Sequence, residues 1–260
     1  MDALAGRWRR AVSSLKELRL RVAFLRSEVL RADLPSVARA LDDLCRDAEQ
    51  ANPLARDVLG AVVPVLVDPA LSERVEQLRE LASSHALLPL SRLLRRKARR
   101  PEAQPASPAP DERLVATSSA GRALTLGERR ALARRPTRAA FDALLRDPHP
   151  LVIRNLLANP RLTEDDVVRL AARRPANAEV LTEIAKHPEW PQRARVRMAI
   201  VQNPGAPQEI AVPMVRLLLR PELLRLAAAA DVPAVVRAAA RELLDRRPPV
   251  PHKPGGPLAQ

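Results

Sequence analysis

Prolines that close short helical runs recur between residues 136 and 248 at intervals of 12 to 17 residues. Proline disfavours helical backbone in the residue before it and suits the first turn of the helix that follows. Each interval therefore predicts one short helix of about two to four turns. The prolines that divide the chain in this way are Pro136, Pro148, Pro160, Pro175, Pro188, Pro204, Pro221, Pro233 and Pro248.

The predicted helices fall into groups of three whose sequences correspond. The segment 126–136 matches 165–175, and both end in Arg-Arg-Pro. A period of about 39 to 46 residues is typical of a stacked helical solenoid, for which about three units are the minimum. The alternative is a non-repetitive bundle whose prolines imitate a repeat. The other matches are 137–148 with 177–188, 152–160 with 196–204, and a weaker third copy at 208–221, 222–233 and 234–248.

Several residues predict where these helices begin and where the chain turns. Thr125 stands three residues before Glu128, which is the spacing of a capping box. Thr163 precedes three acidic residues that oppose the positive end of the helix dipole. Asn159 and Asn203 stand directly before proline, a place that suits turns, and we expect a purely structural role for both.

Two segments carry a resemblance to a known family. The sequences NPRLTEDDVVRLA (159–171) and NPGAPQEIAVPMVRLL (203–218) resemble the bacterial variant leucine-rich repeat and the wider group of HEAT-like helical repeats. The resemblance covers about 150–248 well and 125–150 less well, and it implies an α-helical solenoid. The iron–sulfur cofactor of the family needs a cysteine cluster, whereas this chain has one cysteine. Its three-helix unit is also longer than the family's two-helix unit, so we use the label HEAT-like.

The first hundred residues predict a helical domain. Apolar residues follow one another in steps of three and four from Leu4 to Val29, which predicts one long helix with a heptad-like seam. Three interpretations are open: a helix packed on its own domain, a coiled-coil or partner contact through 4–29, or a basic amphipathic helix, residues 1–31, on anionic lipid. Further helices are predicted at 36–50, 53–67, 70–83 and 86–100.

We therefore expect an all-α protein with an N-terminal helical domain followed by a short α-solenoid of about three HEAT-like units. Between them, residues 101–124 carry four prolines within ten residues, so this segment buries little apolar surface and is predicted to be a linker. The expected divisions are a helical domain at 1–100, the Pro-rich linker at 101–124, the solenoid at 125–248 and a disordered tail at 249–260.

The net charge of +14 favours an acidic partner. The excess is uneven, because residues 1–91 hold 13 cations and 13 acids, whereas 92–100 hold six cations and no acid. That run is either a binding patch or the C-terminus of a helix, where cations are favoured. Further arginines in corresponding positions of the first two units predict a basic stripe, with a dispersed, solvated arginine surface as the alternative. The candidate contacts for a polyanion or a partner protein are Arg92, Arg95, Arg96, Lys97, Arg99 and Arg100, and Arg130, Arg134, Arg135, Arg169, Arg173 and Arg174.

No set of residues predicts catalysis, a metal or a cofactor. The chain has no Gly-rich phosphate loop and no HExxH motif. His149 and His187 occupy corresponding helix junctions, where we expect capping or solvated roles. The single cysteine, Cys45, permits no intramolecular disulfide and is expected to be a buried thiol. The longest apolar run, 58–67, is about half of the ~20 residues that span a bilayer, and the N-terminus lacks the apolar stretch of a secretion signal. A cytoplasmic location is therefore expected.

Two functions of different classes follow from these features. The first is a non-enzymatic scaffold that binds another protein through the extended surface of a solenoid. The second is a HEAT-like module that binds a nucleic-acid backbone, since this group includes alkylpurine DNA glycosylases that resemble the chain in size and helical class. Base reading and single-strand binding need aromatic platforms, and Trp190 is the strong candidate for one in the repeat region. Backbone-directed binding is therefore the form of this alternative that we expect.

Overall fold

The computed structural model describes residues 2–95, 115–117 and 121–247, and the regular structure within these ranges is helical. The exception in the described residues is an isolated antiparallel bridge between Thr117 and Ala123. The all-α class predicted from the sequence is confirmed. The predicted linker lies mostly outside the described residues, and the predicted tail at 249–260 lies wholly outside them.

Two of the N-terminal helices, α3 and α4, begin at residues whose side chains cap them. The side chains of Asp33 and Asn52 accept hydrogen bonds from the backbone N–H groups of Ser36 and Ala55, and a proline lies in the first turn of both helices. The elements are α1 (Ala3–Ser14), α2 (Leu18–Arg31), α3 (Leu34–Glu49), α4 (Pro53–Leu66), the 3-10 helix η1 (Pro69–Leu71), α5 (Ser72–Ser84) and α6 (Leu88–Leu93).

These bounds confirm the helices predicted at 36–50 and 53–67. The helix predicted at 70–83 is also present, divided into η1 and α5. The helix predicted at 86–100 is shorter than expected in the described residues, because α6 ends at Leu93.

The single long helix predicted between Leu4 and Val29 is wrong, because the chain breaks at residues 15–17 into α1 and α2. The break lets α1 pack against α3 and α4 while α2 packs against α4. Arg21 stabilises it, since its Nε donates a hydrogen bond of 2.6 Å to the carbonyl oxygen of Leu15. The apolar seam faces inward, and Trp8 and Val29 lie in the core. Packing on the protein's own helices therefore accounts for the seam.

Short helices follow one another through residues 126–246, as the proline spacing predicts. Both predicted capping sites are confirmed: Thr125 forms a capping box with Glu128 at the first of these helices, and Thr163 forms one with Asp166. The elements are α7 (Leu126–Arg134), α8 (Arg138–Leu144), α9 (Pro150–Leu157), α10 (Glu164–Ala172), α11 (Ala178–Ala185), the 3-10 helix η3 (Trp190–Gln192), α12 (Ala194–Gln202), α13 (Gln208–Val215), α14 (Arg220–Ala228) and α15 (Ala234–Arg246).

One capping arrangement recurs at intervals of 44 residues. Asn159, Asn203 and Arg247 stand directly before prolines, follow α9, α12 and α15, and are all buried. Because the last carbonyls of a helix have no partner within it, a side chain from elsewhere must bind them. The three residues do this for α7, α10 and α13, the first helices of the three predicted units. Asn159 Nδ2 donates to the carbonyl of Arg134 at 3.3 Å. Asn203 Nδ2 donates to the carbonyls of Ala171 (2.8 Å) and Arg173 (3.0 Å). The guanidinium group of Arg247 donates to the carbonyls of Arg216 and Leu218.

Arginine side chains cap many of the other helix ends. The chain has seven glycines, and neither of the two residues that follow each described helix is glycine, the commonest C-terminal cap. Guanidinium groups replace it by donating to carbonyls at these ends. Arg21 does so at α1, Arg74 at α2, Arg79 at α6, Arg173 at α8, Arg174 at α12, Arg56 at α13, Arg237 and Arg241 at α14, and Arg220 at α15.

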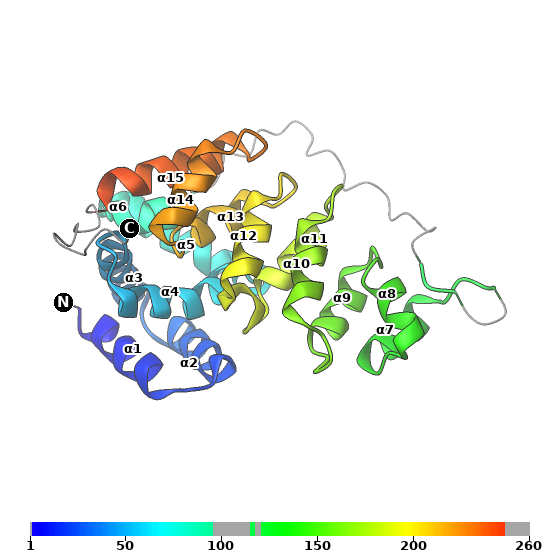
Figure 1. Cartoon of the computed structure of the whole chain (residues 1–260). Coiled ribbons are helices and arrows are strands. Elements are labelled where there is room, and N and C mark those ends of the chain that lie inside the picture. The colour runs from blue at the N-terminus through cyan, green and yellow to red at the C-terminus, as the bar shows by residue number, and fades with distance from the viewer. Residues whose placement is uncertain (1, 96–114, 118–120, 248–260) are drawn as a thin grey trace, which may run out of the picture.

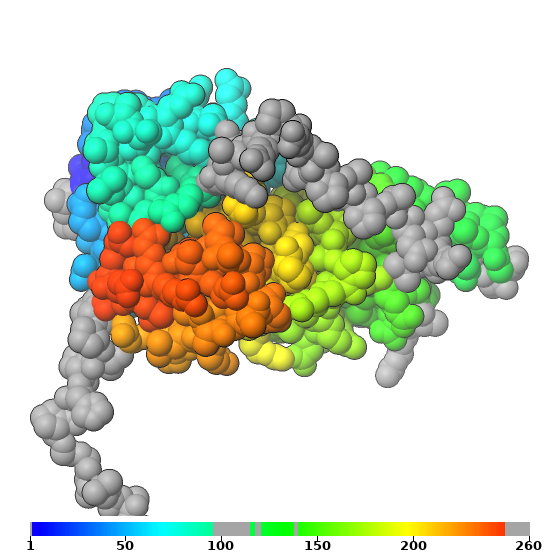
Figure 2. Space-filling model, turned by 90° about the horizontal axis from the view of Figure 1, so that it is seen from above, coloured from blue at the N-terminus to red at the C-terminus, as the bar shows by residue number. Residues whose placement is uncertain are grey.

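The C-terminal helices pack back onto the N-terminal ones. In Figure 1, α13 to α15 lie beside α3 to α6, while α7 and α8 lie at the far end of the molecule. Figure 2 shows α14 and α15, in orange and red, directly beside the cyan and teal of α5 and α6. Arg56 Nη2 donates across this junction to the carbonyl of Leu217 at 3.0 Å. The buried apolar residues of both parts form one cluster.

A buried ion cluster lies at the centre of this junction. Glu49, at the end of α3, accepts hydrogen bonds from Arg92 Nε (2.9 Å) and Nη2 (2.6 Å) on α6. Its Oε1 also pairs with Arg216, which directly follows α13. The side chains of Arg216 and Glu49 are 3% and 6% exposed. One carboxylate thus joins two N-terminal helices to the C-terminal part of the chain.

We expect Asn203→Ala to lower the free energy of unfolding by about 2–3 kcal/mol, because it leaves one buried and one half-buried carbonyl without their donor. Asn159→Ala is the matched control and should cost about 1 kcal/mol, since it removes one longer hydrogen bond. Chemical denaturation of the intact chain measures both losses. Equal losses would contradict the stronger capping role assigned to Asn203.

Glu49→Gln should lower the free energy of unfolding by about 3–5 kcal/mol, because it leaves two buried guanidinium groups without their counter-charge. The control is Glu242→Gln, which affects pairs with the more exposed Arg95 and Arg246 and should cost about 0–1 kcal/mol. Denaturant titration of both variants provides the comparison. A loss at Glu49 no larger than the loss at Glu242 would show that the buried cluster does not hold the two parts together.

Candidate functional site

The first group of predicted cations, residues 92–100, is partly used inside the fold. Arg92 is bound to Glu49, and its side chain is 12% exposed. Arg95 lies at the surface, where its guanidinium pairs with Glu242 of α15 at 3.0 Å. The remaining members, Arg96, Lys97, Arg99 and Arg100, lie outside the described residues, and their role remains a prediction.

The arginines of the predicted stripe on α10 and directly after it bind partners within the chain. Arg169 pairs with Asp166 one turn earlier on the same helix. Arg174 lies 3.2 Å from Asp231 and the same distance from the carbonyl oxygen of Gln202. The neighbouring Arg173 donates to a carbonyl at the end of α8 at 2.8 Å. These cations therefore contribute to helix ends and surface ion pairs.

The arginines of the predicted stripe at α7, at the far end of the molecule, are bound less than those at α10. Arg134 and Arg135 are exposed, and their side chains make no hydrogen bond or ion pair with a described residue. Arg130 is half-buried, and its Nε is enclosed without a hydrogen-bond partner in the described structure. Free cations of the predicted stripe thus lie at one end of the repeat region.

Trp190 contributes to the packing of the fold. It is half-buried in η3 and packs against the apolar core. Its indole Nε1 donates a hydrogen bond of 3.0 Å to the carbonyl oxygen of Leu157. The ring centroid lies 6.0 Å from that of His187, with the planes inclined by 35°. The indole of Trp190 is therefore partly used in packing and hydrogen bonding within the fold.

The histidines at the two corresponding junctions act as caps, as predicted. His149 Nδ1 accepts the backbone N–H of Leu151 at 3.1 Å, and His187 Nδ1 accepts that of Glu189 at 3.2 Å. Burial lowers the pKa of His187 from 6.5 to about 4. Cys45 is a buried free thiol, as expected, and burial raises its pKa to about 12.

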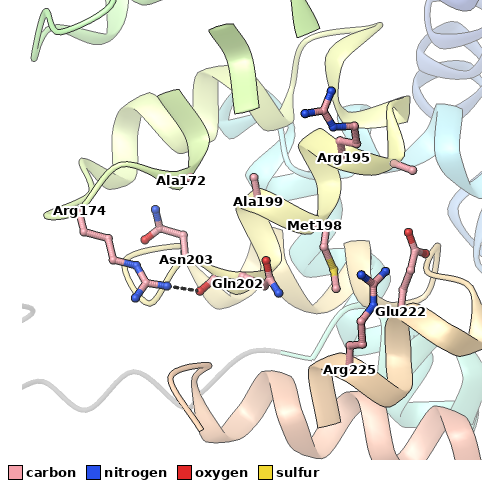
Figure 3. A pocket seen from close by; sticks show the side chains of 10 residues that line it. Ala172, Arg174, Arg195, Met198, Ala199, Gln202, Asn203, Glu222 and Arg225 are labelled. Carbon is pink, nitrogen blue, oxygen red and sulfur yellow. Dashed lines mark hydrogen bonds between the residues drawn. The ribbon is translucent and has the colours of Figure 1, made fainter. Parts of the chain in front are cut away.

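A groove with a volume of about 320 Å³ lies between α10, α12 and α14. Figure 3 shows Met198 of α12 beside Arg225 and Glu222 of α14, with Arg174 at the opposite side beyond Gln202 and Asn203. Alanines at 172, 194 and 199 line it, so short side chains leave the space open. Gln202, Asn203 and Arg195 complete the lining.

Three guanidinium groups and one carboxylate surround this groove. Arg195 Nη1 lies 2.6 Å from Asp165, and both side chains are more than 60% exposed, at 63% and 68%. Arg174 pairs with Asp231, as described above. Arg225 is exposed and makes no ion pair or hydrogen bond with a described residue. Glu222 is used at the start of α14, where its carboxylate accepts the backbone N–H of Leu219 at 2.6 Å.

A second hollow, of about 710 Å³, lies between η1 and the helices α9 and α11. Its charged groups are matched within the chain. Glu183 binds Arg154 through both oxygens, at 2.8 and 2.7 Å, and also pairs with Lys186 at 2.7 Å. Asp68 pairs with Arg26 at 2.6 Å. This hollow therefore offers a partner few unpaired charges.

Sequence reasoning included Arg174 but missed Arg195, Met198 and Arg225 of the first groove. A weak signal exists in the spacing of Ala194, Met198 and Gln202, which places them on one face of α12. That face differs from the buried one, yet a lone methionine at helical spacing also fits a core position. The convergence of three helices on this point is a tertiary feature that the local pattern does not contain.

Comparisons of the chain with models of protein families, with curated proteins and with solved structures find no match. Among the described residues, no helix combines the length and apolar character needed to span a membrane. The same residues contain no group of three or more histidine, cysteine or carboxylate side chains placed to hold a metal ion.

The low pKa of His187 predicts a pH dependence of stability. The unfolded ring takes up a proton near pH 6.5, whereas the folded ring does so only near pH 4. Its contribution is therefore complete above about pH 6.5 and is lost as the pH falls through about 4. His187→Asn keeps a side-chain acceptor for Glu189 N–H and should remove part of this decline. Denaturation curves of both proteins between those pH values measure the difference, and parallel declines would contradict the prediction.

Proposed function

We propose that this chain is a non-enzymatic helical-repeat scaffold that binds a partner protein. In this proposal residues 125–248 form three HEAT-like units, each closed by the cap at Asn159, Asn203 or Arg247. The 44-residue recurrence of these caps supports the repeat. The helices of residues 2–95 cover the array at the end where α13 and α15 lie, which suits a solenoid, because its end units need a cover.

The observation that carries the proposal is the internal use of the arginines. A net charge of +14 favours a polyanion when the cations are free at the surface. Here guanidinium groups cap the ends of short helices and pair with carboxylates, and Arg92 and Arg216 are buried around Glu49. The groove beside Met198 combines an apolar part, formed by Met198 and three alanines, with polar and charged side chains, and this mixture suits a peptide chain better than a phosphate backbone.

The alternative partner is a nucleic-acid backbone. The exposed Arg134 and Arg135 favour it, because they lack partners in the described residues. Two neighbouring cations neutralise few phosphates, and binding to duplex DNA depends on the number neutralised. Trp190 is half-buried, and its indole N–H is already bonded to the carbonyl of Leu157, which limits its use as a stacking platform.

A DNA titration separates the two functions. We expect the intact protein to bind a duplex of about 20 base pairs with a dissociation constant above roughly 10 µM at about 50 mM salt, measured by fluorescence anisotropy. The outcome against the proposal is micromolar binding that falls steeply with salt, with a log–log slope near −0.9 for each neutralised phosphate. Loss of that binding in Arg134→Glu/Arg135→Glu would assign it to α7.

A second experiment tests for the partner protein directly. The intact protein is immobilised through a terminal tag and incubated with nuclease-treated extract. We expect a defined protein to be retained in stoichiometric amount, and nuclease treatment should not change its recovery. Purified candidate and purified chain should then form a complex in solution, measured by calorimetry. Recovery that depends on intact nucleic acid would contradict the scaffold.

A further inference from the structure

We infer that the groove between α10, α12 and α14 binds an acidic peptide segment of a partner protein, with one apolar side chain seated on Met198 and carboxylates on either side of it. This inference rests on the proposed scaffold function and names the partner's chemistry and its place on the fold. The groove lies at the junction of the second and third predicted units.

The centre of the groove suits an apolar side chain. Met198 is half-buried, and Ala172, Ala194 and Ala199 beside it have only a methyl group each. Methionine is flexible and polarizable, so it adapts to different apolar groups. A volume of about 320 Å³ is near the lower end for ligand pockets, and it matches one or two side chains rather than a whole cofactor.

The lining carries more positive than negative charge, with three arginines and one carboxylate, Glu222. Arg174, Arg195 and Arg225 come from three different elements and surround the groove, as Figure 3 shows. Arg225 has no partner in the described residues. The pairs of Arg195 with Asp165 and of Arg174 with Asp231 lie at the surface, where an ion pair contributes about 0–1 kcal/mol. A carboxylate from a partner can therefore replace the intrachain acid at little cost.

One further group in the lining favours a peptide as the occupant. The side-chain amide of Gln202 lines the groove and makes no hydrogen bond with a described residue, so it is free to donate to and accept from a peptide bond. The carboxylate of Glu222, which also lines the groove, accepts the backbone N–H of Leu219 at the start of α14. A phosphate backbone would use the three arginines but would leave the apolar centre around Met198 without a partner.

The test uses the full chain and two synthetic peptide pools of about ten residues, each with a central Leu, Met or Phe. One pool has Asp and Glu on both sides of that residue, and the matched pool has Lys and Arg. We expect the acidic pool to bind with micromolar affinity in fluorescence anisotropy and the basic pool not to bind. No binding of the acidic pool at about 100 µM would overturn the inference.

Variants then locate the binding. Arg225→Glu is a surface change and should weaken the acidic peptides about tenfold or more, as should Met198→Glu. The matched controls are Arg10→Glu on α1 and Leu20→Glu on α2, which make the same replacements at exposed positions of the N-terminal helices and should change affinity less than about twofold. Binding that Arg225→Glu leaves unchanged would overturn the groove assignment, and this holds even if Met198→Glu impairs folding.

Duplex DNA serves as the competing probe. If DNA displaces the acidic peptides and Arg225→Glu weakens the DNA as well, the groove is a polyanion site, and the inference is wrong. If the retained protein of the extract experiment binds Arg225→Glu as well as it binds the unchanged chain, the scaffold function stands and the groove assignment fails. The two proposals therefore fail by different results.

Discussion

Short helices impose the constraint on which the rest of this structure depends: every helix end exposes carbonyl groups that need donors. Proline spacing keeps the helices of the repeat region at 7 to 13 residues, so these ends are frequent. With no glycine in the two positions after any described helix, polar side chains provide the donors. Asparagine does this at Asn203, and arginine, which has a longer side chain, does it at Arg247. The same cap is therefore built from different residues.

The buried cluster around Glu49 extends this dependence from single helices to the whole described chain. Arg216 follows α13 and is buried, so its charge needs a buried acid, and the acid comes from α3. Arg92 of α6 shares that acid. Arg247 also donates to the carbonyl of Arg216, so Arg216 is one link between the third predicted unit and the N-terminal helices. Arg216 consequently acquires its buried counter-charge from a residue more than a hundred positions earlier in the chain.

The sequence predicted local structure better than tertiary structure. Proline spacing and the Thr125 and Thr163 caps located the short helices, because helix starts and stops are set by nearby residues. The apolar seam from Leu4 to Val29 led to the wrong prediction of one long helix, because two helices that share a core satisfy the same spacing. The groove around Met198 was not predicted at all. Its arginines come from three elements, and their convergence depends on packing that no local pattern encodes.

The position of the groove follows from the cap that recurs along the chain. Asn203 lines the groove and at the same time fixes the end of α10 through two hydrogen bonds, and its Oδ1 accepts the Gly205 N–H at 3.0 Å. The adjacent Gln202 is held through its backbone carbonyl by Arg174, which leaves its side chain available. A wall built from a buried, fully bonded residue is preorganised, so a ligand does not have to order it on binding. The residues that close the predicted repeat unit therefore also give the proposed binding surface its fixed shape.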